Sequence, residues 1–325
     1  MTLPKTVAAF ALMAAVATGS GAFAEVFPVR PVKLITAGAP GSIPDSLARP
    51  LAGELAHILG QPVVVENRPG AGGIVAIQLL AHARPDGYTI GLVNRAQLVD
   101  NVYLFPKLPY DPQRDFKPVI NLVAGAGVVA VHPSFPAATL QELVAHAQTR
   151  PGKIHYAIPQ TGSPPHLLAL RLSAATQIEL VAVPFRGNAE ALTAVIAGDV
   201  PILFDAPIMV APHVRAGKLK AIVVTSSKRS QLLPDTPTVA ESGYPALEGE
   251  AWLGLIVPTG VPEAIVSQIN QSASRALRAT ALKEHLESSG WRIVGGSSGD
   301  FAVTIEKDHA RWGTVITKSG IRLGS

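Results

Sequence analysis

Cysteine is absent from the 325-residue sequence, which excludes disulfide bonds, thiol catalysis and cysteine-ligated metal sites. Charged residues account for only 15% of the chain and aromatic residues for 5%. The mean hydropathy of +0.30 is too high for a disordered or coiled-coil protein. No run of lysine and arginine exceeds two residues, so the sequence lacks the basic patch typical of nucleic-acid-binding proteins. We therefore expect a globular protein of about two domains that is stabilised by its apolar core.

The one pronounced apolar run lies close to the N-terminus. Lys5 precedes eleven apolar residues at 7–17, and residues 22–24 (Ala-Phe-Ala) have the pattern of a signal-peptidase site. A membrane-spanning helix needs about 20 apolar residues, so this run is too short to be an anchor. The sequence therefore predicts a signal peptide at residues 1–24, cleaved after Ala24, and a periplasmic location for the mature chain. No cysteine is present to tether that chain through a lipid.

After the predicted signal peptide, short β-rich runs alternate with helical patterns. Leu47, Leu51, Leu55 and Leu59 recur at every fourth residue, which is typical of an amphipathic helix. Such alternation indicates βαβ units with parallel strands, and hence the α/β class.

Two loops that run from a strand directly into a helix are the first candidates for a binding site. They span residues 38–45 and 161–166, with Ser42 and Ser163 placed as helix caps and Pro164 at the first helical position. Ligands of open α/β sheets bind at the carboxyl ends of strands, and a helix start favours a carboxylate or phosphate. An ordinary capped helix would show the same spacing, so a purely structural role stays open.

Other side chains near predicted strand ends are weaker candidates. Arg186, followed by Gly187, would pair with a ligand carboxylate or take part in a structural ion pair. Asp205 would hold a water or a ligand amine, or would only shape a turn. His166 either faces a ligand or caps a helix. The histidine spacing gives no zinc motif.

Two motif matches fail in their context. Residues 295–299 fit G-x-S-x-G, but too few residues follow for the acid and histidine of a hydrolase, so we expect Ser298 or Asp300 to cap a helix. Residues 125–130 fit a dinucleotide-binding pattern, but they lead into a β-rich run instead of a helix. One enzymatic alternative is open, an exported serine hydrolase that uses Ser163, His166 and Asp205.

Residues 60–73, GQPVVVENRPGAGG, resemble the signature of the Bug-type receptors, the extracytoplasmic solute-binding proteins of tripartite tricarboxylate transporters. The resemblance extends over the whole mature chain in the same order. It continues through residues 85–89, 108–112, 115–119, 183–187, 216–219, 233–238 and 252–255.

The resemblance implies a type II periplasmic-binding-protein fold, in which two α/β domains flank a ligand cleft. Domain 1 would comprise residues 25–123 and 249–325, and domain 2 residues 124–248, with crossings near Val123 and Glu248. The chain would be a monomer without enzymatic activity or cofactor that delivers a small organic carboxylate to membrane subunits of the transporter. A receptor that feeds a signalling partner is the alternative.

The same resemblance implies that the two loops hold the ligand carboxylate. Where most members have a glycine, this chain has Ser42, and Pro164-Pro165 is stiffer than usual. The expected ligand-binding residues lie in the two loops and at the two later strand ends. They are Ala39, Pro40, Gly41, Ser42, Asp45, Thr161, Gly162, Ser163, His166, Arg186, Gly187 and Asp205.

Overall fold

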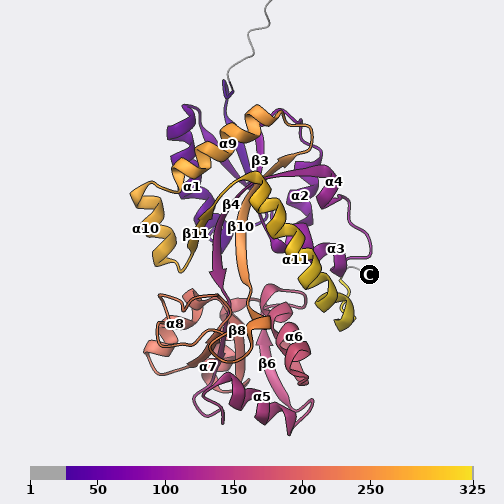
Figure 1. The fold of residues 1–325 in the computed structure, drawn as a ribbon, viewed down its shortest axis with the longest axis vertical. Helices are drawn as coiled ribbons and strands as arrows, with labels where there is room; N and C mark the ends of the chain where they lie inside the picture. The colour runs from indigo at the N-terminus through magenta and orange to yellow at the C-terminus, as the bar shows by residue number, and fades with distance from the viewer. Residues whose placement is uncertain (1–26, 324–325) are drawn as a thin grey trace, which may run out of the picture.

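Two separate β-sheets organise residues 27–323, the part of the chain that the computed structural model describes (Figure 1). The strand order is β11-β4-β10-β3-β1-β2 in a six-stranded sheet and β7-β6-β8-β5-β9 in a five-stranded sheet. The sheets lie one above the other along the long axis of the molecule, with helices packed around each. The predicted signal peptide and its cleavage site lie outside the described residues.

The strands are short except for two. They are β1 Val32–Thr36, β2 Val63–Asn67, β3 Thr89–Asn94, β4 Phe116–Ala126, β5 Val128–Val131, β6 Ile154–Ile158, β7 Leu180–Pro184, β8 Ile202–Asp205, β9 Lys220–Val224, β10 Glu250–Pro258 and β11 Arg292–Gly295. The two long strands, β4 and β10, lie side by side in the six-stranded sheet.

The helices and helical turns follow the strands in alternation. They are α1 Ile43–Leu59, η1 Ala71–Gly73, α2 Ile74–Ala81, η2 Ala96–Asp100, α3 Asn101–Leu104, α4 Pro112–Asp115, α5 Leu140–Gln148, α6 Pro164–Thr176, α7 Asn188–Ala197, α8 Pro207–Arg215, η3 Pro245–Leu247, α9 Glu263–Ala276, α10 Thr280–Ser288 and α11 Ser298–Ser319. None of these helices, within residues 27–323, has the length and apolarity needed to cross a bilayer.

The sheets are mixed, not purely parallel. β1 pairs in parallel with β2 and β3, and β6 pairs in parallel with β7 and β8, as the βαβ pattern predicts. β10 is antiparallel to β3 and β4, and β5 is antiparallel to β8 and β9. β11 is also antiparallel to β4, so the antiparallel pairs involve β5 and β10, which border the crossings between the sheets, and β11.

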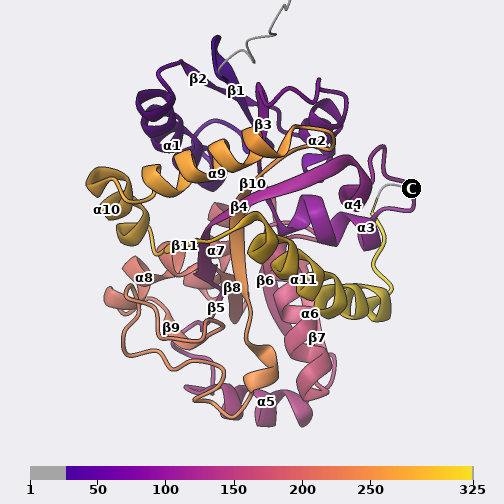
Figure 2. The ribbon, with the colours of Figure 1, turned by 45° about the horizontal axis from the view of Figure 1, so that its top comes forward.

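The chain passes between the sheets at two glycines. Only Gly127 separates the end of β4 from the start of β5, and Gly249 directly precedes β10 on the return (Figure 2). Thr225 joins these passages: its Oγ1 accepts a hydrogen bond from Gly127 N at 2.8 Å, and its carbonyl accepts one from Gly249 N at 2.9 Å. The division of the chain into domains at residues 123 and 248 stays a prediction.

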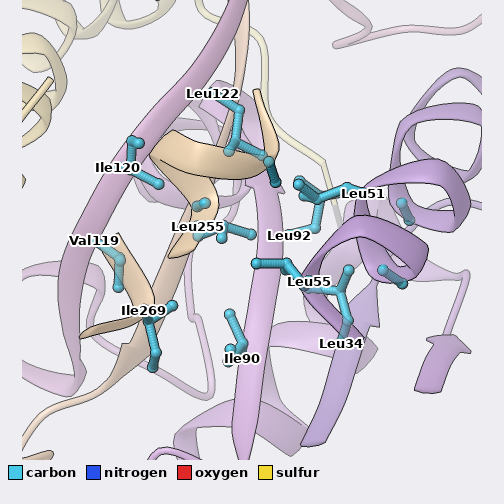
Figure 3. Packing of buried hydrophobic residues seen from close by; sticks show 14 of the residues in the cluster. Leu34, Leu51, Leu55, Ile90, Leu92, Val119, Ile120, Leu122, Leu255 and Ile269 are labelled. Carbon is cyan, nitrogen blue, oxygen red and sulfur yellow. The ribbon is translucent and has the colours of Figure 1, made fainter. Parts of the chain in front are cut away.

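Helix α1 shows how the apolar pattern builds the core. Leu51 and Leu55 are fully buried against Leu34 of β1 and neighbouring strands (Figure 3). The helix continues through Pro50, which cannot donate the usual hydrogen bond to the Ser46 carbonyl four residues earlier. His285 Nε2 of α10 lies 3.1 Å from that carbonyl oxygen and satisfies it.

Candidate functional site

A cleft of about 530 Å³ lies between the two sheets, at the carboxyl ends of β1, β3, β6, β7 and β8. Its lining comes from the loops after these strands, from the crossing segments around Gly127 and Gly249, and from the start of β11. The lining includes Ile43, Pro44, Arg95, Asp100, Ser163, Pro164, Pro165, Gly187, Asn188, Asp205, Ile208, Glu250, Trp252, Trp291 and Trp312. This is where ligands bind in open α/β sheets.

The first predicted loop is anchored by Asp45. The buried carboxylate accepts hydrogen bonds from Gly41 N at 2.8 Å, from Arg49 Nε at 2.9 Å and from Asn67 Nδ2 at 2.8 Å. Burial acts to raise the pKa of Asp45, but the bonds from Arg49, Gly41 and Asn67 outweigh it and hold the pKa below its usual value. Asp45 therefore fixes the shape of the loop, and the neighbouring Ile43 and Pro44 form the cleft wall.

Ser42, in the same loop, does not make the helix-capping bond that the sequence predicts. It stands at the cap position of α1 with extended backbone angles, yet its side chain makes no capping bond. Its Oγ is buried and has no hydrogen-bond partner among the described residues. Ala39, Pro40 and Gly41 are exposed beside it.

The second predicted loop repeats this design with a histidine. Gly162 N donates to Nδ1 of the buried His166 at 3.0 Å, which places the ring proton on Nε2. Burial lowers the pKa of His166, so the ring stays neutral and adds no charge to the cleft. The Ser163 hydroxyl donates to the Gln160 carbonyl at 2.7 Å. Ser163 lines the cleft, whereas Thr161 is an exposed part of the same loop.

The ends of β7 and β8 bring Gly187 and Asp205 to the cleft, but Arg186 does not line it. Both carboxylate oxygens of Asp205 accept from Asn188 Nδ2 at 3.0 Å, and Ala206 N donates at 2.7 Å. Burial raises the pKa of Asp205 above its ordinary value. Arg186 is exposed and lies outside the lining, and its backbone N–H donates to Glu190 Oε2 at 2.7 Å.

Arg95 lines the cleft although the sequence argument did not select it. It follows the last residue of β3, so it lies at the same sheet edge as the loop after β1, the neighbouring parallel strand. Its Nε donates to both carboxylate oxygens of the buried Asp100, at 3.0 and 3.1 Å. Its guanidinium carbon lies 3.6 Å from the ring centroid of Trp312 on α11. The rule that placed the first two loops at strand ends would also have selected this position.

The described residues contain no group of three or more histidine, aspartate or glutamate side chains that could hold a metal ion. The polar groups of the cleft are instead those of a site for a small organic molecule, with apolar walls and a few fixed polar contacts.

Comparison with known proteins shows which family the chain belongs to. The profile of the tripartite tricarboxylate transporter family receptor matches residues 47–321. The chain belongs to this family. It is similar to protein BugT of Bordetella pertussis, with 32% identity over 92% of each chain.

Solved structures give the same result. The receptor is similar to MatC of Rhodopseudomonas palustris with bound malate, with 34% identity, a TM-score of 0.76, and 89% of this chain and 100% of that chain covered. It is also similar to an R. palustris protein with adipate, with 31% identity, a TM-score of 0.79, and 91% and 99% covered. The predicted fold is confirmed: two α/β domains flank a ligand cleft, as in periplasmic binding proteins.

The receptor is a binding protein and not an enzyme, in agreement with its family. The hydrolase alternative also fails on geometry. A nucleophilic serine must donate its proton to a base, but the Ser163 hydroxyl donates to Gln160 and His166 Nδ1 accepts from Gly162. Asp205 is bonded to Asn188 and orients no histidine. Members of the family are periplasmic binding proteins.

Proposed function

We propose that this receptor captures a small organic carboxylate in the cleft and delivers it to the membrane subunits of a tripartite transporter. The observation that supports this most directly is that the helix starts of α1 and α6, which lie on different sheets, border the same cleft. Positive dipole ends that converge from two sides favour an anion between them. Malate and adipate, bound in the two similar proteins, are both small organic carboxylates.

The residues proposed for ligand binding act in two ways. Ser163, Gly187 and Asp205 lie on the cleft surface and would touch the ligand. The other residues belong to the loops that shape the two helix starts, and Arg186 would act at the rim. These loop residues are Ala39, Pro40, Gly41, Ser42, Asp45, Thr161, Gly162 and His166.

The proposed mechanism is closure of the two domains around the ligand. A ligand that contacts both walls binds the closed form more tightly than the open form, and it shifts the population accordingly. Bending would be confined to the two crossings, where Gly127 and Gly249 connect the sheets. The closed monomer, exported after cleavage at Ala24, would then present a recognisable surface to its membrane partner.

Thermal unfolding of residues 25–325 with malate, adipate and other organic acids tests this function. A ligand at 100 times its Kd should stabilise the folded protein by about 2.7 kcal/mol. Absence of a shift with every acid, or consumption of the acid during incubation, would contradict the proposal.

A matched pair of glycine variants ties the signal to the cleft. Gly41 has φ +79° and Gly217 φ +68°, and neither position has an atom within 4 Å of an added Cβ. Valine at either position should therefore cost a similar amount, about 1–2 kcal/mol of backbone strain. We expect Gly41→Val to abolish the ligand-induced shift and Gly217→Val, in a turn after α8, to preserve it.

A further inference from the structure

The guanidinium of Arg95 is held in place through Nε, and its two Nη groups make no hydrogen bond to residues 27–323. Its side chain is 8% exposed, and both hydrogen bonds that it makes to residues 27–323 start from Nε and end on Asp100. Trp312 covers one face of the guanidinium. The Nη groups are not among the buried unpartnered atoms, unlike Arg171 Nη1, so they remain accessible from the cleft. A fixed planar fork of this kind suits a carboxylate because little rotamer freedom is lost on binding.

The charges of the cleft make Arg95 its main anion-binding group. Among the lining residues within the described chain, Arg95 is the one cation, and the acids are Asp100, Asp205 and Glu250. Asp100 uses only Nε of Arg95, and Glu250 pairs with Arg292 at 2.5 Å. The Nη edge is therefore the one place on the lining where a side-chain cation can meet a ligand.

Backbone donors at the two helix starts are few. Proline occupies position 44 of α1 and positions 164 and 165 of α6, and it has no N–H group. The N–H groups of Gly41 and Gly162 are already used by Asp45 and His166. An acid group in this cleft consequently depends on a side-chain donor more than helix starts alone would suggest.

The walls of the cleft are suited to an apolar ligand body. Ile43 at the start of α1 is 41% exposed, and Ile208 near the start of α8 is 37% exposed. They come from the two different domains, and both border the cleft together with Trp291 and Trp312. Water-exposed isoleucines on facing domains gain by contact with an apolar group between them.

We propose that the ligand is a carboxylate with an apolar body, that its acid group binds the Nη edge of Arg95, and that its body lies between Ile43 and Ile208. This inference rests on the proposed receptor function. It makes Arg95 a specificity-determining residue that separates acids from their neutral isosteres.

Calorimetric titration with benzoate, adipate, malate and the neutral benzamide tests the inference. We expect benzoate and adipate to bind the native protein more tightly than malate. Benzamide should bind about 10- to 100-fold more weakly than benzoate, because it lacks the charge-assisted bonds. Tighter binding of malate than of both other acids would refute the proposal that the ligand has an apolar body. Equal binding of benzamide and benzoate would refute the proposal that Arg95 binds the acid group.

Variants separate binding from folding. Arg95→Met combined with Asp100→Asn removes both charges of the buried pair, and it should weaken acid binding about 10- to 100-fold and leave benzamide binding unchanged. Arg95→Lys keeps the positive charge but lacks the planar guanidinium, so its acid affinity should lie between those of the native protein and the double variant. If the double variant does not fold, Arg95→Lys tests the role of Arg95 alone. Arg311→Met, an exposed neighbour of Trp312, is the control and should bind like the native protein.

The outcomes keep the two proposals apart. Acid binding by the native protein with unchanged affinity in the folded Arg95 variants overturns the inference and leaves the receptor function intact. Failure of the native protein to bind any of these acids or others in the thermal screen counts against the receptor function itself.

Discussion

At the residue scale, three of the strand-to-helix loops at the cleft share one feature. The side chain of the third helical residue accepts a hydrogen bond from the backbone N–H that precedes the cap residue. The pairs are Asp45 with Gly41 at 2.8 Å, His166 with Gly162 at 3.0 Å, and Glu190 with Arg186 at 2.7 Å. Each loop is fixed before a ligand arrives, which lowers the entropy lost on binding.

Replacement of Asp45 by asparagine should destabilise the protein at neutral pH. The carboxylate has a lowered pKa, so its contribution is complete above the unfolded pKa near 4 and is lost as the pH falls through the folded pKa. We expect Asp45→Asn to cost about 1–3 kcal/mol at pH 7 and less at pH 3, measured by urea unfolding. Glu287→Gln, in an exposed pair with Lys283, should change stability by less than about 0.5 kcal/mol. Equal losses at both pH values would contradict this assignment.

His166 should give a different pH window. Its pKa is lowered by burial, so below the ordinary value near 6.5 the unfolded chain binds a proton that the folded loop does not. Stability due to His166 is therefore present above pH 6.5 and decreases as the pH falls towards the folded pKa. His166→Phe should cost about 1–3 kcal/mol at pH 7.5 and less at pH 5.5, whereas a constant difference would refute the role. Exposed His57→Gln serves as the control.

At the scale of elements, the two crossings are joined through the end of β9. Thr225 is 2% exposed and bonds both Gly127 and Gly249, one on each passage. Thr225→Val keeps the shape but leaves Gly127 N without its acceptor, and it should cost about 1–3 kcal/mol in urea unfolding. Thr225→Ser retains the hydroxyl and should lose clearly less. Equal losses in the two variants would assign the effect to packing.

The sequence allowed good prediction of elements whose signals are local. The leucine spacing of α1 and the two strand-to-helix loops are visible within about fifteen residues of chain, and the structure has them. Of the two residues expected to cap α11, Asp300 takes part in the cap: its carboxylate accepts from Ser297 N at 2.8 Å, and Ser297 Oγ accepts from Asp300 N at 3.1 Å. Ser298 does not cap the helix and donates to the Pro118 carbonyl.

The missed features depend on partners that lie far apart in the chain. The position of Arg95 at a strand end is a local signal, but the stacking of its guanidinium on Trp312 of α11 joins two distant segments. The antiparallel pairing of β4 with β10 joins segments on either side of the whole five-stranded sheet. No pattern within one segment of sequence reports such contacts.

At the scale of the whole molecule, ligand binding should make the receptor more compact. Closure about the two crossings would bring the radius of gyration towards the value for a compact chain of this length, about 19 Å. Small-angle X-ray scattering with and without a saturating acid measures this change. Gly41→Val with the same acid is the control, and an unchanged radius in the liganded native protein would exclude closure.

The position of the tryptophans has a practical consequence. The chain has three, and all of them border the cleft. The indole of Trp252 is bonded to Asp308 at 2.7 Å and that of Trp312 is stacked on Arg95, so Trp291 is the ring least constrained by polar partners. Tryptophan fluorescence of the native protein, excited at wavelengths where its five tyrosines do not absorb, is thus emitted entirely from the walls of the cleft. Unlabelled receptor reports its own occupancy, and single Trp→Phe variants would show which wall a ligand touches.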